Sequence, residues 1–147
     1  MSTNTLQATG LSVWQELRNN IRETEVWMRN QIRDFLDEFE ITRQQLSILQ
    51  ILKAANNEPL STKEIQTLMV DKRSDTSRLV DRLIEKDLVR KRKDPDDGRL
   101  VQVYIKYEGL RLLAQIEDRM SSLDKRFEKL NADEAEELNR LLSKLKD

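Results

Sequence analysis

Four consecutive cations, Arg90–Lys93, form the densest positive cluster in the sequence, and the segment Asp94–Gly98 separates them from one further arginine, Arg99. Clustered lysines and arginines bind nucleic-acid phosphates, because each neutralised phosphate releases condensed counterions. The charge is also local: residues 72–99 contain ten Lys or Arg and seven Asp or Glu, whereas the rest of the chain contains 16 basic and 20 acidic residues. The cluster therefore indicates phosphate binding, although a charged hairpin that only improves solubility has the same composition.

The end of this segment predicts a turn followed by an outward-reaching arginine. Pro95 suits an early turn position, and Gly98 is free to adopt a positive φ. Arg99 can enter a minor groove, because narrow A·T-rich stretches attract arginine. We expect the Asp97 carboxylate to hold the Arg99 guanidinium through a paired hydrogen bond.

Histidine and cysteine are both absent from the sequence. Their absence excludes a histidine general base, a thiolate nucleophile, disulfides and zinc sites built from His or Cys. We therefore predict no catalytic residues, no metal site and no cofactor. No apolar run approaches the roughly 18 residues of a membrane span, and the first ten residues lack the features of a signal peptide. The expectation is a cytoplasmic protein without a membrane partner.

The elements that would position these cations follow from the apolar spacing and the helix-capping residues. Thr42, Ser61, Ser74 and Asn131 suit helix N-caps, and Ser61 with Glu64 has the form of a capping box. The spacing predicts helices over residues 11–39, from 42 to before 56, 61–69, 74–86, 108–130 and 131–145, and strands over 89–93 and 100–105.

This order of elements is that of a winged helix-turn-helix, a mainly α fold with a small β-wing. We predict a single domain over 1–147, with a winged lobe over about 42–106 and a mobile arm over 1–10. The apolar seams of the helices over about 11–39 and 108–147 exceed what one winged lobe can bury. These helices are therefore expected to dimerise.

Residues 74–86 have the character of a helix that reads a major groove. A helical wheel places Thr76 and the aliphatic residues on one side and Ser74, Ser77 and Arg78 on the other. Small hydroxyls allow close approach, and an arginine can donate two parallel hydrogen bonds to guanine. An ordinary solvated helix face is the alternative. The predicted DNA contacts are Ser61, Thr62, Lys72, Arg73, Ser74, Thr76, Ser77, Arg78, Arg82, Arg90, Lys91, Arg92, Lys93, Asp97 and Arg99.

Three short strings, LVDRLIEK at 79–86, LVR at 88–90 and DGR at 97–99, resemble the MarR family of bacterial and archaeal winged-helix regulators. Asp97, Arg99, Val103 and Ile105 match the family's wing pattern D-x-R-x-x-x-V-x-L-T. The chain departs from the family where Asp87 replaces a glycine after the reading helix, where Lys106 replaces the threonine of the wing pattern, and where Gln66 replaces a small residue. An aspartate tolerates the left-handed conformation, so the geometry at position 87 can survive.

The resemblance implies a homodimeric, sequence-specific DNA-binding regulator that represses transcription from palindromic operators. It further implies release by a small, often aromatic, acid that binds between the dimer helices and the winged lobe. Trp14, Arg22, Trp27 and Met28 are the residues we expect to line such a site. The alternatives are a winged-helix adaptor that binds another protein and an architectural protein that binds DNA without sequence preference.

Overall fold

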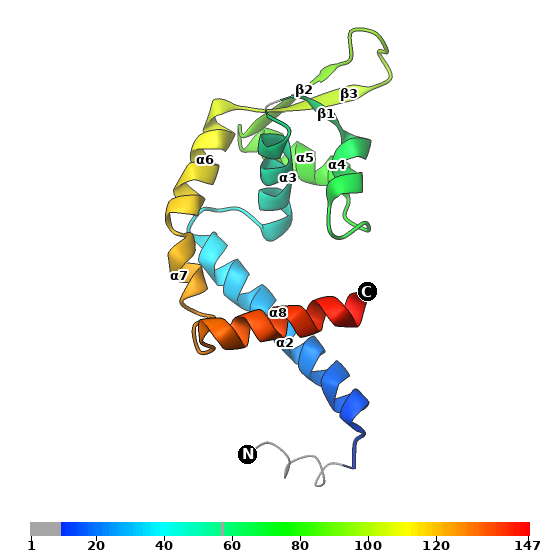
Figure 1. Cartoon of the computed structure of the whole chain (residues 1–147). Helices are drawn as coiled ribbons and strands as arrows, with labels where there is room; N and C mark the ends of the chain where they lie inside the picture. The colour runs from blue at the N-terminus through cyan, green and yellow to red at the C-terminus, as the bar shows by residue number, and fades with distance from the viewer. Residues whose placement is uncertain (1–9, 57) are drawn as a thin grey trace.

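The computed structural model describes residues 10–56 and 58–147, and it has the mainly helical winged fold predicted from the sequence. The helices are α2 (Val13–Asp37), α3 (Arg43–Ala54), α4 (Thr62–Leu68), α5 (Thr76–Glu85), α6 (Tyr107–Asp118), α7 (Met120–Asp124) and α8 (Ala132–Lys146). Figure 1 shows a lobe made of α3 to α6 and a small sheet, with α2, α7 and α8 extending away below it. Among the described residues, none of these helices is long and apolar enough to cross a membrane. The arm predicted over 1–10 lies almost entirely outside the described residues.

Capping residues set the helix starts, and most of the sequence-based boundaries are confirmed to within two residues. The hydroxyls of Thr42 and Ser61 and the amide oxygen of Asn131 each accept a hydrogen bond from the backbone N–H three residues later. The side chains at those later positions bond back to the cap backbone, which completes three capping boxes. Ser12 caps α2 in the same way, although the sequence analysis did not identify it.

The core of the lobe joins the helix-turn-helix to the wing. Its fully buried side chains come from the end of α2, from α3, α4 and α5, from the sheet and from α6, and they include Leu49, Ile65, Leu83, Val103 and Leu113. Because each element contributes one apolar face to this cluster, the opposite faces of α4, α5 and the sheet remain available at the surface.

The sheet has three antiparallel strands in the order β1-β3-β2, where β1 is Leu60–Ser61, β2 is Val89–Lys93 and β3 is Val101–Ile105. The two wing strands were predicted, and β2 has the predicted bounds. The short strand β1, in which Leu60 pairs with Val103, was missed, because two residues show no alternation in sequence.

The prediction of one helix over 108–130 is wrong. The helix is interrupted at Arg119, where the backbone N–H bonds to the carbonyl of Ile116 instead of one four residues back, and residues 125–130 form turns. These turns place Phe127 edge-on to Trp27, with ring centroids 5.1 Å apart. They also allow the guanidinium of Arg126 to donate to the carbonyl of Gln31 at 3.0 Å. Packing against α2 therefore ends the helix.

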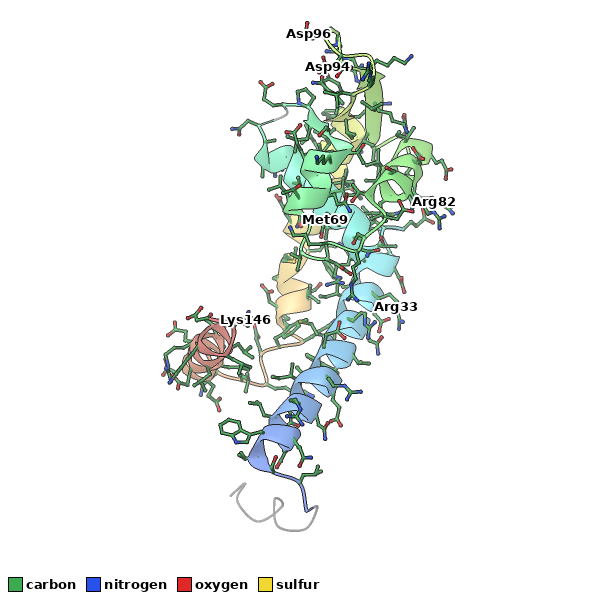
Figure 2. All side chains as sticks on the ribbon, turned by 90° about the vertical axis from the view of Figure 1, so that its right-hand side faces the viewer. Arg33, Met69, Arg82, Asp94, Asp96 and Lys146 are labelled. Carbon is green, nitrogen blue, oxygen red and sulfur yellow. The ribbon has the colours of Figure 1, made fainter. Side chains whose placement is uncertain are left out.

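Two helices leave apolar surface uncovered in the single chain. None of the residues of α8 is buried, and Figure 2 shows α8 standing apart from α2 although the two cross in Figure 1. The exposed large apolar residues of these helices are Val13, Trp14, Leu17, Ile21, Val26 and Trp27 on α2 and Leu138, Leu141, Leu142 and Leu145 on α8. On α2, only Phe35 and Leu36, at the end nearest the lobe, are buried.

Candidate nucleic-acid interface

The helix in the reading position is α5, and both of its ends are fixed by local hydrogen bonds. At its start, the Asp75 carboxylate accepts from the backbone N–H of Arg78 at 3.2 Å. At its end, Asp87 adopts the left-handed conformation with φ 61°, and its N–H bonds to the carbonyl of Ile84 while the Leu88 N–H bonds to that of Leu83. This pair of bonds is a Schellman motif, so the aspartate fills the glycine position as expected.

The outward placement of Ser74 from the helical wheel is wrong. The helix begins at Thr76 instead of residue 74, and Ser74 lies in the preceding turn with 7% of its surface exposed. There its hydroxyl accepts from the side-chain amide of Gln44 at 3.1 Å. Thr76 is 3% exposed and lies on the packed side, where the wheel placed it. Neither side chain is therefore accessible for the DNA contact that we predicted for it.

The exposed face of α5 carries Ser77, Arg78, Asp81, Arg82 and Glu85. Figure 2 shows Arg82 projecting outward from this helix. Two acidic residues lie beside its arginines: Arg78 is 3.7 Å from Asp75, and Arg82 is 3.9 Å from Glu85. Pairs this exposed contribute little stability, so their arginines can exchange a carboxylate for a phosphate or a base at low cost.

The remaining predicted contacts of the helix-turn-helix lie around α4. Ser61 and Thr62 are half-buried at its start, and the Ser61 hydroxyl already serves as the helix cap. Lys72 and Arg73 are exposed in the turn before α5. The Lys72 ammonium donates to the carbonyl of Thr67, and the guanidinium of Arg73 lies 3.7 Å from Asp71. Of these four residues, only the two cations are exposed.

The wing divides its four consecutive cations between two faces. Cross-strand partners share a face of a sheet, and Lys91 pairs with the buried Val103, whereas Arg90 pairs with Tyr104 and Arg92 with Gln102. The Lys91 ammonium accordingly lies 2.7 Å from Asp81 on α5. Lys91 and Lys93 are thus on the α5 side of the wing, and Arg90 and Arg92 are on the opposite side, which we call the outer face.

Asp94 organises the wing turn. Its Oδ1 accepts from the backbone N–H groups of Asp96 and Asp97 at 2.8 and 3.1 Å, and its own N–H donates to the Leu100 carbonyl at 2.9 Å. With these bonds closing the turn, Gly98 does not adopt the positive φ that we expected. Figure 2 shows Asp94 and Asp96 at the far end of the wing.

The expected pairing of the Asp97 and Arg99 side chains is also wrong. Asp97 Oδ1 instead accepts from the backbone N–H of Arg99 at 3.0 Å, and the ion pairs of the described residues do not include one between their side chains. The guanidinium of Arg99 is exposed and extends from a turn whose backbone is held. Asp97 thus fixes where Arg99 starts and leaves its charged end free.

The left-handed residue at the end of α5, Asp87, also takes part in a charged pair. The Asp87 carboxylate accepts from the ammonium of Lys106, and this hydrogen bond raises the pKa of Lys106 above its usual value. Lys106 occupies the position where the family pattern has threonine, so the two departures from the pattern compensate each other. The pair connects the end of α5 to the end of β3.

The four residues predicted to line a ligand site are not gathered into one site. Trp14 is 67% exposed, Trp27 packs on Phe127, Met28 is half-buried, and Arg22 lies in a separate surface cavity. Trp14 and Met28 are 14 residues apart on one helix, which is about 21 Å at 1.5 Å per residue. A small molecule bound to one chain therefore cannot touch all four.

Sequence reasoning missed an open cavity of about 580 Å³ between α2 and the start of α3. Arg29, Arg33 and Arg43 line it together with Thr42 and the carboxylates of Asp37 and Asp71. Arg29 and Arg33 are four residues apart, a spacing that puts them on one face of a helix, and this was the available signal. No group of three or more acidic residues that could hold a metal ion is found in the described chain.

A helix-turn-helix with an exposed reading helix and a basic wing defines the class of winged-helix DNA-binding proteins. The MarR family model matches residues 41–101, which include the helix-turn-helix and most of the wing. A MarR transcription factor of Planctomyces limnophilus is 30% identical, with 90% of this chain and 97% of that one covered and a TM-score of 0.71. The chain belongs to the MarR family, whose members are transcription regulators and not enzymes.

Three further proteins are similar over most of the chain. An uncharacterised helix-turn-helix transcriptional regulator of Bacillus subtilis, YsmB, is 28% identical, with 88% of each chain covered. A mutant of Escherichia coli MarR in complex with operator DNA has a TM-score of 0.78 at 24% identity, with 92% of this chain and 99% of that one covered. Bordetella bronchiseptica BpsR, whose DNA binding is regulated by 6-hydroxynicotinic acid, has a TM-score of 0.76 at 19% identity, with coverage of 90% and 99%. These two solved structures, both below 25% identity, establish likeness of fold.

Proposed function

We propose that this MarR-family regulator acts in the cytoplasm as a homodimeric repressor that reads a palindromic operator. The observation that carries the proposal is the exposed face of α5, where Ser77, Arg78 and Arg82 lie beside a basic wing. Arginine and serine are residues that read base edges in a major groove, and the wing cations supply phosphate contacts. Escherichia coli MarR, with the same fold, binds operator DNA, which supports this assignment.

A homodimer is supported by the apolar residues that the single chain leaves exposed on α2 and α8. A seam of this kind needs a partner, and a second copy offers the same seam by two-fold symmetry. The proposed division is therefore a DNA-binding lobe over about 42–106 and dimerisation helices over about 11–39 and 108–147. Two-fold symmetry would place the two reading helices about one turn of DNA apart, roughly 34–36 Å.

Regulation by a small acid is the second part of the proposal. The cavity between α2 and α3 is lined by three arginines against the two carboxylates of Asp37 and Asp71, and by the start of α3, so its excess of positive charge favours an anion. It also joins a proposed dimerisation helix to the lobe, so a ligand there contacts both parts. BpsR responds to 6-hydroxynicotinic acid, which makes an aromatic carboxylate the probe of choice.

The test of DNA reading is selection from random duplexes, followed by affinity measurements on the enriched site across a range of salt concentrations. Enrichment of a palindrome with half-sites about one turn apart supports the dimeric regulator. Steep salt dependence without enrichment would identify the non-specific architectural binder instead. Binding no tighter than about 10⁻⁴–10⁻⁶ M, without enrichment, would favour the protein-binding adaptor. A reporter gene placed behind the selected site then distinguishes repression from activation.

The test of the acid is a titration of 6-hydroxynicotinic acid and benzoate into the protein–operator complex. We expect release of DNA, and we expect Arg33→Ala to weaken it. Arg18→Ala, at an exposed position of α2 outside the cavity lining, is the matched control. Release that is equal in both variants would place the acid elsewhere.

A further inference from the structure

The outer face of the wing carries a connected set of side chains that the reading of a major groove does not require. Arg92 lies 4.6 Å and Arg90 lies 5.4 Å from the centre of the Tyr104 ring. The Tyr104 hydroxyl donates to the side-chain oxygen of Gln102 at 3.2 Å. The Gln102 amide then donates to Asp94 Oδ2 at 2.9 Å, and Asp94 holds the wing turn through its other oxygen. Two arginines, an aromatic ring and the turn thus form one unit.

The partner of these two arginines differs from the partners of the cations near the reading helix. Arg73, Arg78, Arg82 and Lys91 each lie beside a carboxylate, which offsets their charge. Arg90 and Arg92 lie instead against a neutral ring. A cation–π contact restrains a guanidinium without neutralising it. The full charge of both arginines therefore remains available to an anion, with less side-chain freedom to be lost on binding.

We propose that Tyr104 and Gln102 are positioning residues that hold Arg90 and Arg92 against the phosphates of DNA flanking the operator. The outer face points away from α5, because the opposite face of β2 carries the lysine that bonds to Asp81. The phosphates that it meets therefore lie beyond the groove that α5 reads. This inference rests on the proposed DNA binding and adds to it a flanking contact that does not depend on base sequence.

The experiment compares two duplexes that contain the selected operator, one ending at its half-sites and one extended by about one turn, roughly 10 base pairs, on each side. We expect the wild-type protein to bind the extended duplex more tightly. Tyr104→Leu should weaken binding to the extended duplex by about 2- to 5-fold, the range of an exposed cation–π contact, and should leave the short duplex unaffected. Tyr104→Phe keeps the ring but loses the hydrogen bond to Gln102, so it should weaken binding to the extended duplex less than Tyr104→Leu does, and by about as much as Gln102→Ala.

A double-mutant cycle separates positioning from a general structural effect. If Tyr104 acts through the two arginines, Tyr104→Leu should have little further effect in a protein that already carries both Arg90→Gln and Arg92→Gln. Thermal unfolding verifies that each variant is folded. Gln102→Ala removes the hydrogen bonds to Tyr104 and Asp94 and keeps the ring. It replaces Tyr104→Leu if that variant does not fold, and it should weaken binding to the extended duplex but not to the short one.

The outcomes distinguish this inference from the function on which it rests. Equal losses on the short and extended duplexes, or an effect of Tyr104→Leu that simply adds to that of the arginine substitutions, would overturn the positioning role while operator binding stands. Unchanged affinity of folded Tyr104→Leu for the extended duplex would do the same. Failure of the wild-type protein to select any operator would instead refute the proposed function itself.

Discussion

The Lys91 ammonium on the wing lies 2.7 Å from Asp81 on α5, so one ion pair joins the wing to the reading helix. Asp81 is on the exposed face of α5, where its carboxylate alone would repel the phosphates of DNA. Lys91 offsets this charge and fixes the base of the wing relative to the helix. In the proposed complex the wing is therefore both a contact surface for DNA and a support for the reading helix.

The two lysines on the α5 side of the wing should affect DNA binding differently. Lys93→Met removes a cation for which no carboxylate partner is found in the described chain, and it should reduce the slope of log affinity against log salt by about one unit. Lys91→Met should leave the slope nearly unchanged and lower affinity by about 2- to 5-fold, in line with an exposed pair of up to about 1 kcal/mol. Affinity measurements across a salt series report both quantities.

The control for the Lys91 effect is the charge of its partner. Asp81→Asn in the Lys91→Met background removes the uncompensated carboxylate and should restore most of the affinity. If Lys91→Met reduces the salt slope as Lys93→Met does, Lys91 contacts a phosphate in the complex, and the supporting role is wrong.

The wing turn predicts a second difference, between Arg99 and Asp97. Arg99→Ala should weaken operator binding by about 1–3 kcal/mol, the range for a lost base contact, because its free guanidinium is the group that can enter a groove. Asp97→Asn should bind nearly as well as the wild type, since the amide oxygen can still accept from the Arg99 N–H. Titration of the selected duplex with each variant measures the two affinities. An equal loss of affinity in both variants would mean that the negative charge of Asp97 is needed for binding.

Local signals in the sequence identified most of the structure that is set by neighbours in the chain, although Asp75 caps α5 in place of the predicted Ser74 and the cap at Ser12 was missed. The caps at Thr42, Ser61 and Asn131 depend on bonds that span three residues, and all three were identified correctly. The break at Arg119 was not, because the contact that accompanies it joins Arg126 to Gln31, 95 residues away. Long-range packing of this kind leaves no pattern in a single sequence.

The candidate site was predictable as a region but not in its details. The cations of the wing and of α5 were located correctly, whereas the burial of Ser74 follows from a turn that the wheel could not show. The cavity beside Arg33 was missed because its lining, which lies within residues 29–44 apart from Asp71, depends on how the chain turns from α2 into α3, and apolar spacing does not show that turn. Side-chain partners such as Tyr104 for Arg92 emerged only with the strand register.

Gly109 predicts a stability effect at the start of α6. A Cβ at this position would lie 2.5 Å from the carbonyl oxygen of Leu88 and 2.8 Å from Cγ1 of Ile105. Leu88 cannot move away easily, since its carbonyl also accepts from the N–H of Lys106. Gly109→Ala should therefore destabilise the protein by about 1–3 kcal/mol despite the better helix propensity of alanine. Thermal unfolding measures this, with Gln115→Ala on the exposed side of α6 as a control that should be near neutral.

Asp87 predicts different effects for two small substitutions. At φ 61° the Cβ of Asp87 is strained, and Asp87→Ala keeps this strain while losing the polar side chain that lets aspartate tolerate the conformation, so it should destabilise by about 1–2 kcal/mol. Asp87→Gly removes the strain and should be close to neutral. Both variants lose the bond to Lys106, whose pKa is raised in the folded protein. That bond stabilises the fold fully below the ordinary lysine pKa and is lost as pH rises through the raised value, so at pH 7 its loss is common to both variants. Comparing the thermal unfolding of the two variants at pH 7 therefore measures the effect of backbone strain alone. Equal Tm values for the two variants would contradict the prediction.

The exposed stripe of α8 gives the prediction that tests the assembly. Leu141→Glu places a charge in the stripe of Leu138, Leu141, Leu142 and Leu145, and it should convert the proposed dimer to a monomer in sedimentation experiments. A monomer can hold only one half-site, so affinity for the palindrome should fall by about 100-fold or more, as expected when two linked contacts become one. Ser143→Glu adds the same charge on the opposite side of the helix and should stay dimeric. If both variants remain dimeric and bind equally well, α8 does not hold the two copies together, and the stripe must be covered in another way.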